Sequence, residues 1–204
     1  HEERIKPVEG LKQMLKKRDM LMLLLLFFIG LGMFNAVTTW IEEILAPRGF
    51  TPMQAGITTA AMLVGGIAGA STLPILSDKY RKRKNFIILT MACMIPGLIG
   101  VTFAEQYWLL LVSAFIFGFF IMSAGPIGFQ YGAEISYPAP ESMSQGLIIL
   151  SGQISGILFI IGMDFFRAEG TRSMTPFMIV FIVLTLFNTM MSFKLRESKI
   201  INTD

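Results

Sequence analysis

The stretch that decides the fold is residues 106–133, QYWLLLVSAFIFGFFIMSAGPIGFQYGA, in which 28 consecutive residues include no Asp, Glu, Lys or Arg. A helix on the surface of a soluble protein would carry a charge every turn or two. An apolar run of about 20 residues is instead long enough to cross a hydrocarbon core roughly 30 Å thick. The stretch therefore predicts a membrane-spanning helix.

Five further stretches of the chain share this property. The full set of charge-free stretches is 20–41, 49–77, 85–104, 106–133, 142–163 and 173–193. Only 15% of the residues are charged, against about 25% in a typical soluble domain, and these charges fall between the stretches. The pattern predicts an all-α integral membrane protein with six transmembrane helices.

The domain boundaries follow from the same pattern. We expect a basic arm at 1–19, a transmembrane domain at 20–195 and a short tail at 196–204. The spans expected within that domain are 20–45, 52–76, 85–104, 107–135, 142–165 and 174–194.

The composition argues against an enzyme or a nucleic-acid-binding protein. One cysteine, Cys93, permits no intrachain disulfide and no cysteine-based metal site, and His1 is the only histidine. Glu42, Glu134 and Asp164 are scattered toward span ends, so they form no carboxylate pair at depth. We expect no catalytic residue, metal or cofactor, and we attribute the net charge of +3 to the loops.

The loops on the two sides of the membrane differ sharply in positive charge. Three cations, Arg48, Arg167 and Arg172, fall on one side. The other side holds fourteen: Arg4, Lys6, Lys12, Lys16, Lys17, Arg18, Lys79, Arg81, Lys82, Arg83, Lys84, Lys194, Arg196 and Lys199. This asymmetry predicts that both termini are cytoplasmic, in a plasma membrane or a prokaryotic inner membrane.

Small residues recur at a four-residue spacing in two spans. The second span has Gly65 and Gly69, and the fifth has Gly152 and Gly156. Each pair makes a face on which helices approach closely, and each lies in the second helix of a group of three. We therefore expect two inverted three-helix repeats, with these faces packed against a partner half.

Amides and hydroxyls within the spans mark a candidate path for a solute. Asn35 and Thr38 share one face of the first span, Gln130 lies in the fourth, and Gln153 lies in the fifth. Polar groups in hydrocarbon need partners, so these side chains should face the bundle interior or a cavity. Two interpretations stay open, contact with a solute and ordinary helix–helix hydrogen bonding.

Charged residues at the cytoplasmic ends of the spans suggest a conformational role. Asp78 opens the basic loop, where its carboxylate could pair with Arg81 or with a helix N-terminus. Glu134 lies at the end of the fourth span. We expect Asp78, Arg81 and Glu134 to act in gating or conformational change.

The basic loop resembles a loop of the major facilitator superfamily, which reads Gly-x-x-x-Asp-x-x-Gly-Arg-Arg/Lys. Asp78 fits the acid, Lys82 and Arg83 fit the basic pair, and Pro74 and Arg81 replace the two glycines. The resemblance implies the C-terminal, six-helix half of a twelve-helix transporter.

A closer resemblance runs through residues 128–138, GFQYGAEISYP, and the residues after it. These are similar to the feline leukaemia virus subgroup C receptor-related branch, whose members have been described as exporters or importers of choline, ethanolamine or haem. Gln153 matches a glutamine that choline-handling members use at the substrate. Asn35 stands where those members carry a tyrosine that contacts a quaternary ammonium through its ring, so the resemblance leaves the substrate open.

We therefore expect secondary transport of a small organic solute by alternating access, with substrate contacts from Gln153, Asn35, Gln130 and Thr38. The expected partners are the solute, the lipid bilayer and an N-terminal six-helix half of the same transporter, with no nucleic acid. The alternative is a six-span channel or pore subunit that oligomerises through its glycine faces.

Overall fold

The structure, a computed structural model, describes residues 7–168 and 173–198. Within these residues every regular element is a helix, and six helices are long and apolar enough to cross a membrane. The predicted fold class is therefore confirmed. The loop cations Arg4, Lys6, Arg172 and Lys199 lie outside the described residues.

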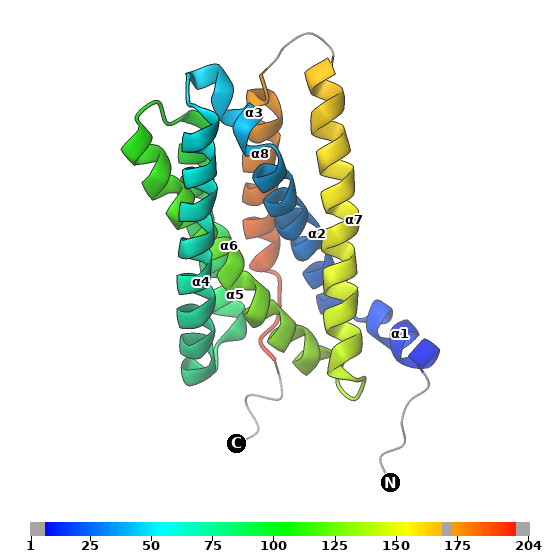
Figure 1. Cartoon of the computed structure of the whole chain (residues 1–204). Helices are drawn as coiled ribbons and strands as arrows, with labels where there is room; N and C mark the ends of the chain where they lie inside the picture. Colours follow the sequence, from blue (N-terminus) through cyan, green and yellow to red (C-terminus); the bar gives the residue numbers. More distant parts are fainter. Residues whose placement is uncertain (1–6, 169–172, 199–204) are drawn as a thin grey trace.

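The six long helices pack into one bundle (Figure 1). They are α2 (Arg18–Thr39), α4 (Pro52–Tyr80), α5 (Arg83–Phe103), α6 (Tyr107–Ser136), α7 (Glu141–Ala168) and α8 (Thr175–Ser192). Three short helices accompany them: α1 (Pro7–Lys16), α3 (Ile41–Leu45) and the 3₁₀ turn Ala46–Arg48. The chain is a multi-pass integral membrane protein.

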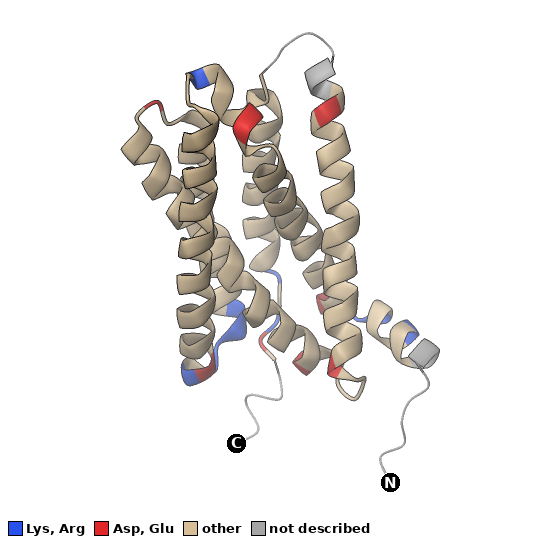
Figure 2. Cartoon of the chain, in the orientation of Figure 1, with Lys and Arg blue, Asp and Glu red and all other residues tan. Residues whose placement is uncertain are grey.

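Charged residues gather at the two ends of the bundle, and the ribbons between carry almost none (Figure 2). The described N- and C-terminal segments lie at the same end, which we call the terminal end; the opposite end is the far end (Figure 1). The uncharged middle is the part that hydrocarbon can surround without burying an unpaired charge.

The first predicted span, 20–45, is in fact two helices. Trp40 ends α2 with φ −102° and ψ 16°, and α3 begins at Ile41. The Trp40 indole Nε1 donates to the Ile160 carbonyl at 3.2 Å, which fixes this break to the far end of α7. Arg48 follows, donating to the carbonyls of Val101 and Ala104 at 2.6 and 2.9 Å.

Burial lowers the pKa of the Arg48 guanidinium from its ordinary value, but an arginine stays charged at neutral pH. The carbonyls that it contacts are at the C-terminal end of α5, where the helix dipole favours a cation. Arg48 therefore ties the far end of α2 and α3 to α5.

The long helix α4 begins and ends at residues suited to those positions. Thr51 and Gln54 form a reciprocal capping box, with the Gln54 side chain accepting from the Thr51 N–H at 2.9 Å, and Pro52 occupies the first turn. At the other end Arg81 adopts a left-handed conformation with φ 52°. This conformation stops the helix and turns the chain into α5 within two residues.

The helix pairs follow the symmetry expected for two three-helix repeats. Exchanging the first three long helices for the last three, in order, exchanges α2 with α6, α4 with α7, and α5 with α8. The extensive α4–α6 contact then maps onto the extensive α2–α7 contact, and the α5–α6 contact maps onto α2–α8. The two repeats therefore share their main helix pair, whereas the α2–α8 contact is much smaller than the α5–α6 contact.

Glycines set the distance between the paired helices. A side chain at Gly65 or Gly69 of α4 would strike the backbone of Phe115 or Phe119 in α6, and one at Gly118 of α6 would strike the Met62 carbonyl of α4. The interface is thus packed backbone against backbone from both sides.

The glycines of α7 face α2 in the same way. A Cβ at Gly152 would lie 2.6 Å from the Leu31 Cβ, and one at Gly156 would lie 2.9 Å from the Asn35 amide nitrogen. The prediction that the small-residue faces pack against a partner half is therefore wrong, because both faces are buried inside this chain.

We predict that Gly118→Val destabilises the protein by about 2 kcal/mol or more, because the added side chain must push α4 away from α6. The measurement is thermal unfolding in detergent, in which the fraction of protein that remains monodisperse is recorded against temperature. Gly146→Val is the matched control, since a side chain at Gly146 of α7 meets nothing within 4 Å. Equal stability of the two variants would contradict the packing described.

Candidate functional site

A polar pocket of about 220 Å³ lies between α2 and α7. Its lining residues are Asn35, Thr38, Thr39, Gln153, Gly156, Ile157 and Ile160. Three of the four residues that the sequence predicts to contact a solute, Asn35, Thr38 and Gln153, are thus brought together. They come from two helices that are more than a hundred residues apart in the chain.

Local structure explains why the polar groups reach this pocket. Gly156 has no side chain, and the Asn35 amide packs into the space that one would fill. The Thr38 hydroxyl donates to the Phe34 carbonyl at 2.8 Å, so its oxygen keeps acceptor capacity toward the pocket. Gln153 lies about one helical turn before Gly156, on the same side of α7. The Gln153 side chain therefore lines the same pocket as Asn35.

The two amides at this pocket lack partners within the protein. Among residues 7–168 and 173–198, no hydrogen bond forms to the side chains of Asn35 or Gln153. A buried or membrane-embedded amide without a partner is unfavourable by about 1–3 kcal/mol. The pocket therefore offers donors and acceptors that another molecule can satisfy.

The fourth predicted contact residue lies elsewhere. Gln130 is exposed on α6 and lines neither this pocket nor the larger apolar cavity of about 340 Å³ that residues of α2, α4, α5 and α6 line. The shared chemistry of an amide at depth does not reveal which face of α6 carries it. The candidate site described by the structure thus consists of Asn35, Thr38 and Gln153.

A buried ionic cluster joins three helices at the terminal end. The Arg83 guanidinium, at the start of α5, pairs with Asp78 at the end of α4 and with Glu134 near the end of α6, 3.2 Å away. Arg83 and Glu134 expose only 7% and 12% of their side chains, whereas Asp78 exposes 60%. Arg83 also donates to the Ser77 hydroxyl at 3.4 Å.

Of the two pairings expected for Asp78, with Arg81 or with a helix N-terminus, the one with Arg81 is wrong, and Asp78 pairs with Arg83 at the N-terminus of α5. Arg81 does not pair with Asp78. Arg81 forms the left-handed end of α4 and is exposed. Arg83, the first residue of α5, reaches both carboxylates instead. The sequence signal was present, since Arg83 belongs to the basic pair of the loop motif and Arg81 occupies the position of its second glycine.

Three further contacts at the terminal end were not predicted. The Tyr131 hydroxyl donates to the Arg196 carbonyl at 2.7 Å, and Glu197 accepts from the Lys84 N–H at 3.1 Å. The Lys17 ammonium donates to the Ile135 carbonyl at 2.8 Å. These contacts tie the segment after α8, and the start of α2, to the same helix ends that the ionic cluster joins.

Comparison with known proteins agrees with the arrangement. The family model for the Major Facilitator Superfamily matches residues 1–163 of this chain. The chain belongs to this superfamily.

Relatives in the superfamily place the chain near one branch. It is 32% identical to the frog (Xenopus tropicalis) solute carrier family 49 member A3, over 76% of this chain and 33% of that protein. It is 25% identical to the human choline/ethanolamine transporter FLVCR2, over 86% of this chain and 34% of that protein. These relatives confirm the resemblance to the feline leukaemia virus receptor-related branch.

Coverage differs among the relatives. The chain spans about a third of the length of the frog and human proteins. An uncharacterized protein of the archaeon Archaeoglobus fulgidus is 32% identical over 73% of this chain and 69% of its own length. The crystal structure of the nucleoside transporter NupG superposes on 88% of this chain and 44% of NupG, with a TM-score of 0.72 and 16% identity. That likeness concerns the fold.

We predict that Arg83→Met destabilises this superfamily member by about 3 kcal/mol, because it leaves the Glu134 carboxylate buried without its cation. Unfolding in a denaturing detergent titration measures the change. Arg81→Met, two residues away at an exposed position, should change stability little.

The double variant Arg83→Met with Glu134→Leu should recover most of the loss, since it removes the buried charge together with its partner. If Arg83→Met and Arg81→Met unfold alike, the cluster does not hold the helix ends together.

Proposed function

We propose that the chain is half of a twelve-helix secondary transporter that moves a small organic solute by alternating access. One observation supports this most directly. The Asn35 and Gln153 amides have no partner within the described residues, yet they share a pocket between membrane-spanning helices. A transporter needs such groups to replace the hydration of its solute during passage.

The chemistry of the pocket sets the kind of solute. Two neutral amides and the hydroxyls of Thr38 and Thr39 provide donors and acceptors without a fixed charge, and the lining includes no Asp, Glu, Lys or Arg. Such a set fits a small solute with hydroxyl, amine or amide groups. The human relative named a choline/ethanolamine transporter is consistent with this class, and Gln153 matches the glutamine of choline-handling members.

The proposed partner is an N-terminal six-helix half. The chain spans about a third of its frog and human relatives, and the halves of superfamily transporters are parallel repeats about an axis along the membrane normal. The amide of Gln153 is exposed here, so a second half facing it would close the pocket. We place both termini in the cytoplasm, because most cations lie at the terminal end (Figure 2).

The ionic cluster suits alternating access in a specific way. By joining the terminal ends of α4, α5 and α6, the cluster of Arg83, Asp78 and Glu134 makes these ends move as one unit. Rocking of one half against the other requires such internally rigid units. We therefore keep Asp78 and Glu134 as conformational residues and assign their shared cation to Arg83.

We predict that Gln153→Ala raises the apparent KM for the transported solute about fivefold, the factor that corresponds to losing one net hydrogen bond of about 1 kcal/mol. The measurement is uptake into liposomes that contain the full-length protein. Gln145→Ala is the matched control, because Gln145 lies on the same helix but bonds to Glu141 at 2.7 Å, away from the pocket.

Asn35→Ala should weaken uptake in the same direction, since its amide faces the same solute. An unchanged KM in Gln153→Ala, with Gln145→Ala also unchanged, would remove this pocket from the transport path.

A further inference from the structure

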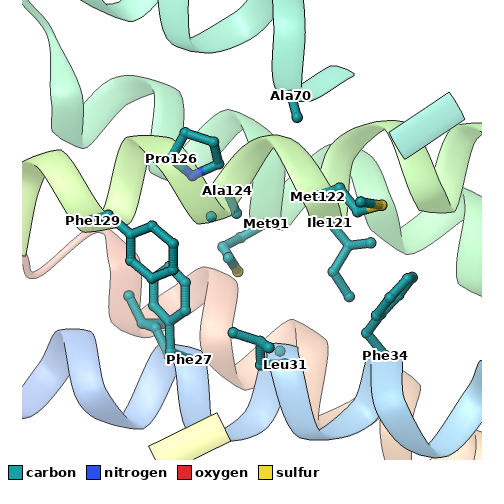
Figure 3. A pocket seen from close by; sticks show the side chains of 13 residues that line it. Phe27, Leu31, Phe34, Ala70, Met91, Ile121, Met122, Ala124, Pro126 and Phe129 are labelled. Atoms are coloured by element: carbon teal, nitrogen blue, oxygen red, sulfur yellow. The ribbon is translucent and has the colours of Figure 1, made fainter. Parts of the chain in front are cut away.

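The apolar cavity of about 340 Å³ lies between α2 and α6, with one residue each from α4 and α5 in its wall (Figure 3). Figure 3 shows Phe27, Leu31 and Phe34 projecting from α2 toward Met122 and Phe129 of α6. Met91 of α5 and Ala70 of α4 complete its wall. Every residue that lines it has an apolar side chain or none, so the cavity suits an apolar group and not a polar one.

The cavity is partly open, with the exposed Pro126 in its lining, and its floor is formed by packed side chains. Phe27 is 5% exposed and Met91 is 3% exposed, so its floor is buried. Gly30 is also buried, yet a Cβ there would meet nothing within 4 Å. A buried glycine next to empty space marks a cavity that the protein does not fill with its own side chains.

Aromatic rings shape two walls of the cavity. The rings of Phe27 and Phe129 stack with their centroids 5.9 Å apart. Gly128 makes this possible, because any side chain there would strike the Phe27 ring. Phe34 packs against Phe117 with centroids 6.4 Å apart. These contacts hold the rings in place, so the cavity is preformed.

The apolar cavity and the polar pocket lie one after the other along α2. The cavity is lined by residues 26–34 of this helix and the pocket by residues 35–39. The centres of these two segments are about 10 Å apart along the helix axis at a rise of 1.5 Å per residue. Leu31 connects them across the interface, since it lines the cavity and packs against Gly152, the neighbour of Gln153.

We propose that the transported solute is amphipathic, with its polar head at Asn35, Thr38 and Gln153 and an apolar group in the cavity. This inference rests on the proposed transport function and narrows the substrate class. The cavity is about twice the size of the roughly 150 Å³ apolar cavity that holds a benzene molecule. It therefore has room for an alkyl chain or a fused ring system.

The test uses a series of N-alkylethanolamines, whose hydroxyl and ammonium groups suit the polar pocket and whose alkyl chains lengthen from methyl to octyl. Full-length protein in liposomes is assayed for uptake and for binding of each member. The expected result is an affinity that rises about fourfold per methylene, the factor for burying one CH₂ group, until the cavity is full.

Two variants fill the cavity from different walls. Gly30→Leu adds its side chain to the open space beside α2, and Ala70→Leu does so from α4. Both should abolish the gain in affinity with chain length, which is measured against the methyl member of the series in the same variant. Gly56→Leu is the matched control, because Gly56 is exposed on α4 with nothing within 4 Å of an added Cβ and does not line the cavity.

The outcomes separate the two proposals. A flat affinity across chain lengths, or a chain-length gain that survives both Gly30→Leu and Ala70→Leu, would overturn the amphipathic solute. Binding of no member, with uptake of another polar solute that depends on Gln153, would overturn it as well and leave transport standing. If Gln153→Ala changes uptake of no solute, the proposed function itself fails. If lipid copurifies with the unaltered protein and is absent only from Gly30→Leu, the cavity holds a lipid acyl chain, and the amphipathic-solute proposal is overturned.

Discussion

The close approach of helix backbones at glycine is the constraint on which the rest of this structure depends. Water does not drive helices together within a membrane, so association relies on van der Waals packing and on polar contacts between helices. Gly69 and Gly118 let α4 and α6 meet backbone to backbone, and Gly152 and Gly156 let α7 settle on α2. Side chains at these four positions would separate the two pairs and open the bundle.

Much of the fold could be predicted from the sequence because the bilayer imposes it. The thickness of the hydrocarbon core sets the length of the charge-free runs, and these runs locate all six long helices. Helix pairing was a different matter. A glycine face indicates that some backbone comes close, but not whose, and we assigned the faces of Gly65 and Gly152 to a partner half. Their neighbours are α6 and α2 of the same chain.

The candidate site was predicted in part, for an equally physical reason. An amide in a span must face a partner, which singled out Asn35, Gln153 and Gln130 alike. The structure unites the first two and leaves Gln130 apart, because the α2–α7 pairing decides which amides meet. At the terminal end, residue type alone could not choose between Arg81 and Arg83. Backbone conformation decides, since Arg81 is the residue at which α4 stops.

The two equivalent helix pairs differ in one respect that bears on where a solute can pass. In α4 and α6, a side chain added at Gly65, Gly69 or Gly118 would meet backbone atoms of Phe115, Phe119 or Met62 first. In α7, Gly152 and Gly156 contact the side chains of Leu31 and Asn35.

The polar pocket lies beside these side-chain contacts, between α2 and α7, whereas the apolar cavity lies between α2 and α6. The place where the repeats depart from each other is therefore where this half has the polar chemistry to hold a solute, next to the room that the apolar cavity provides.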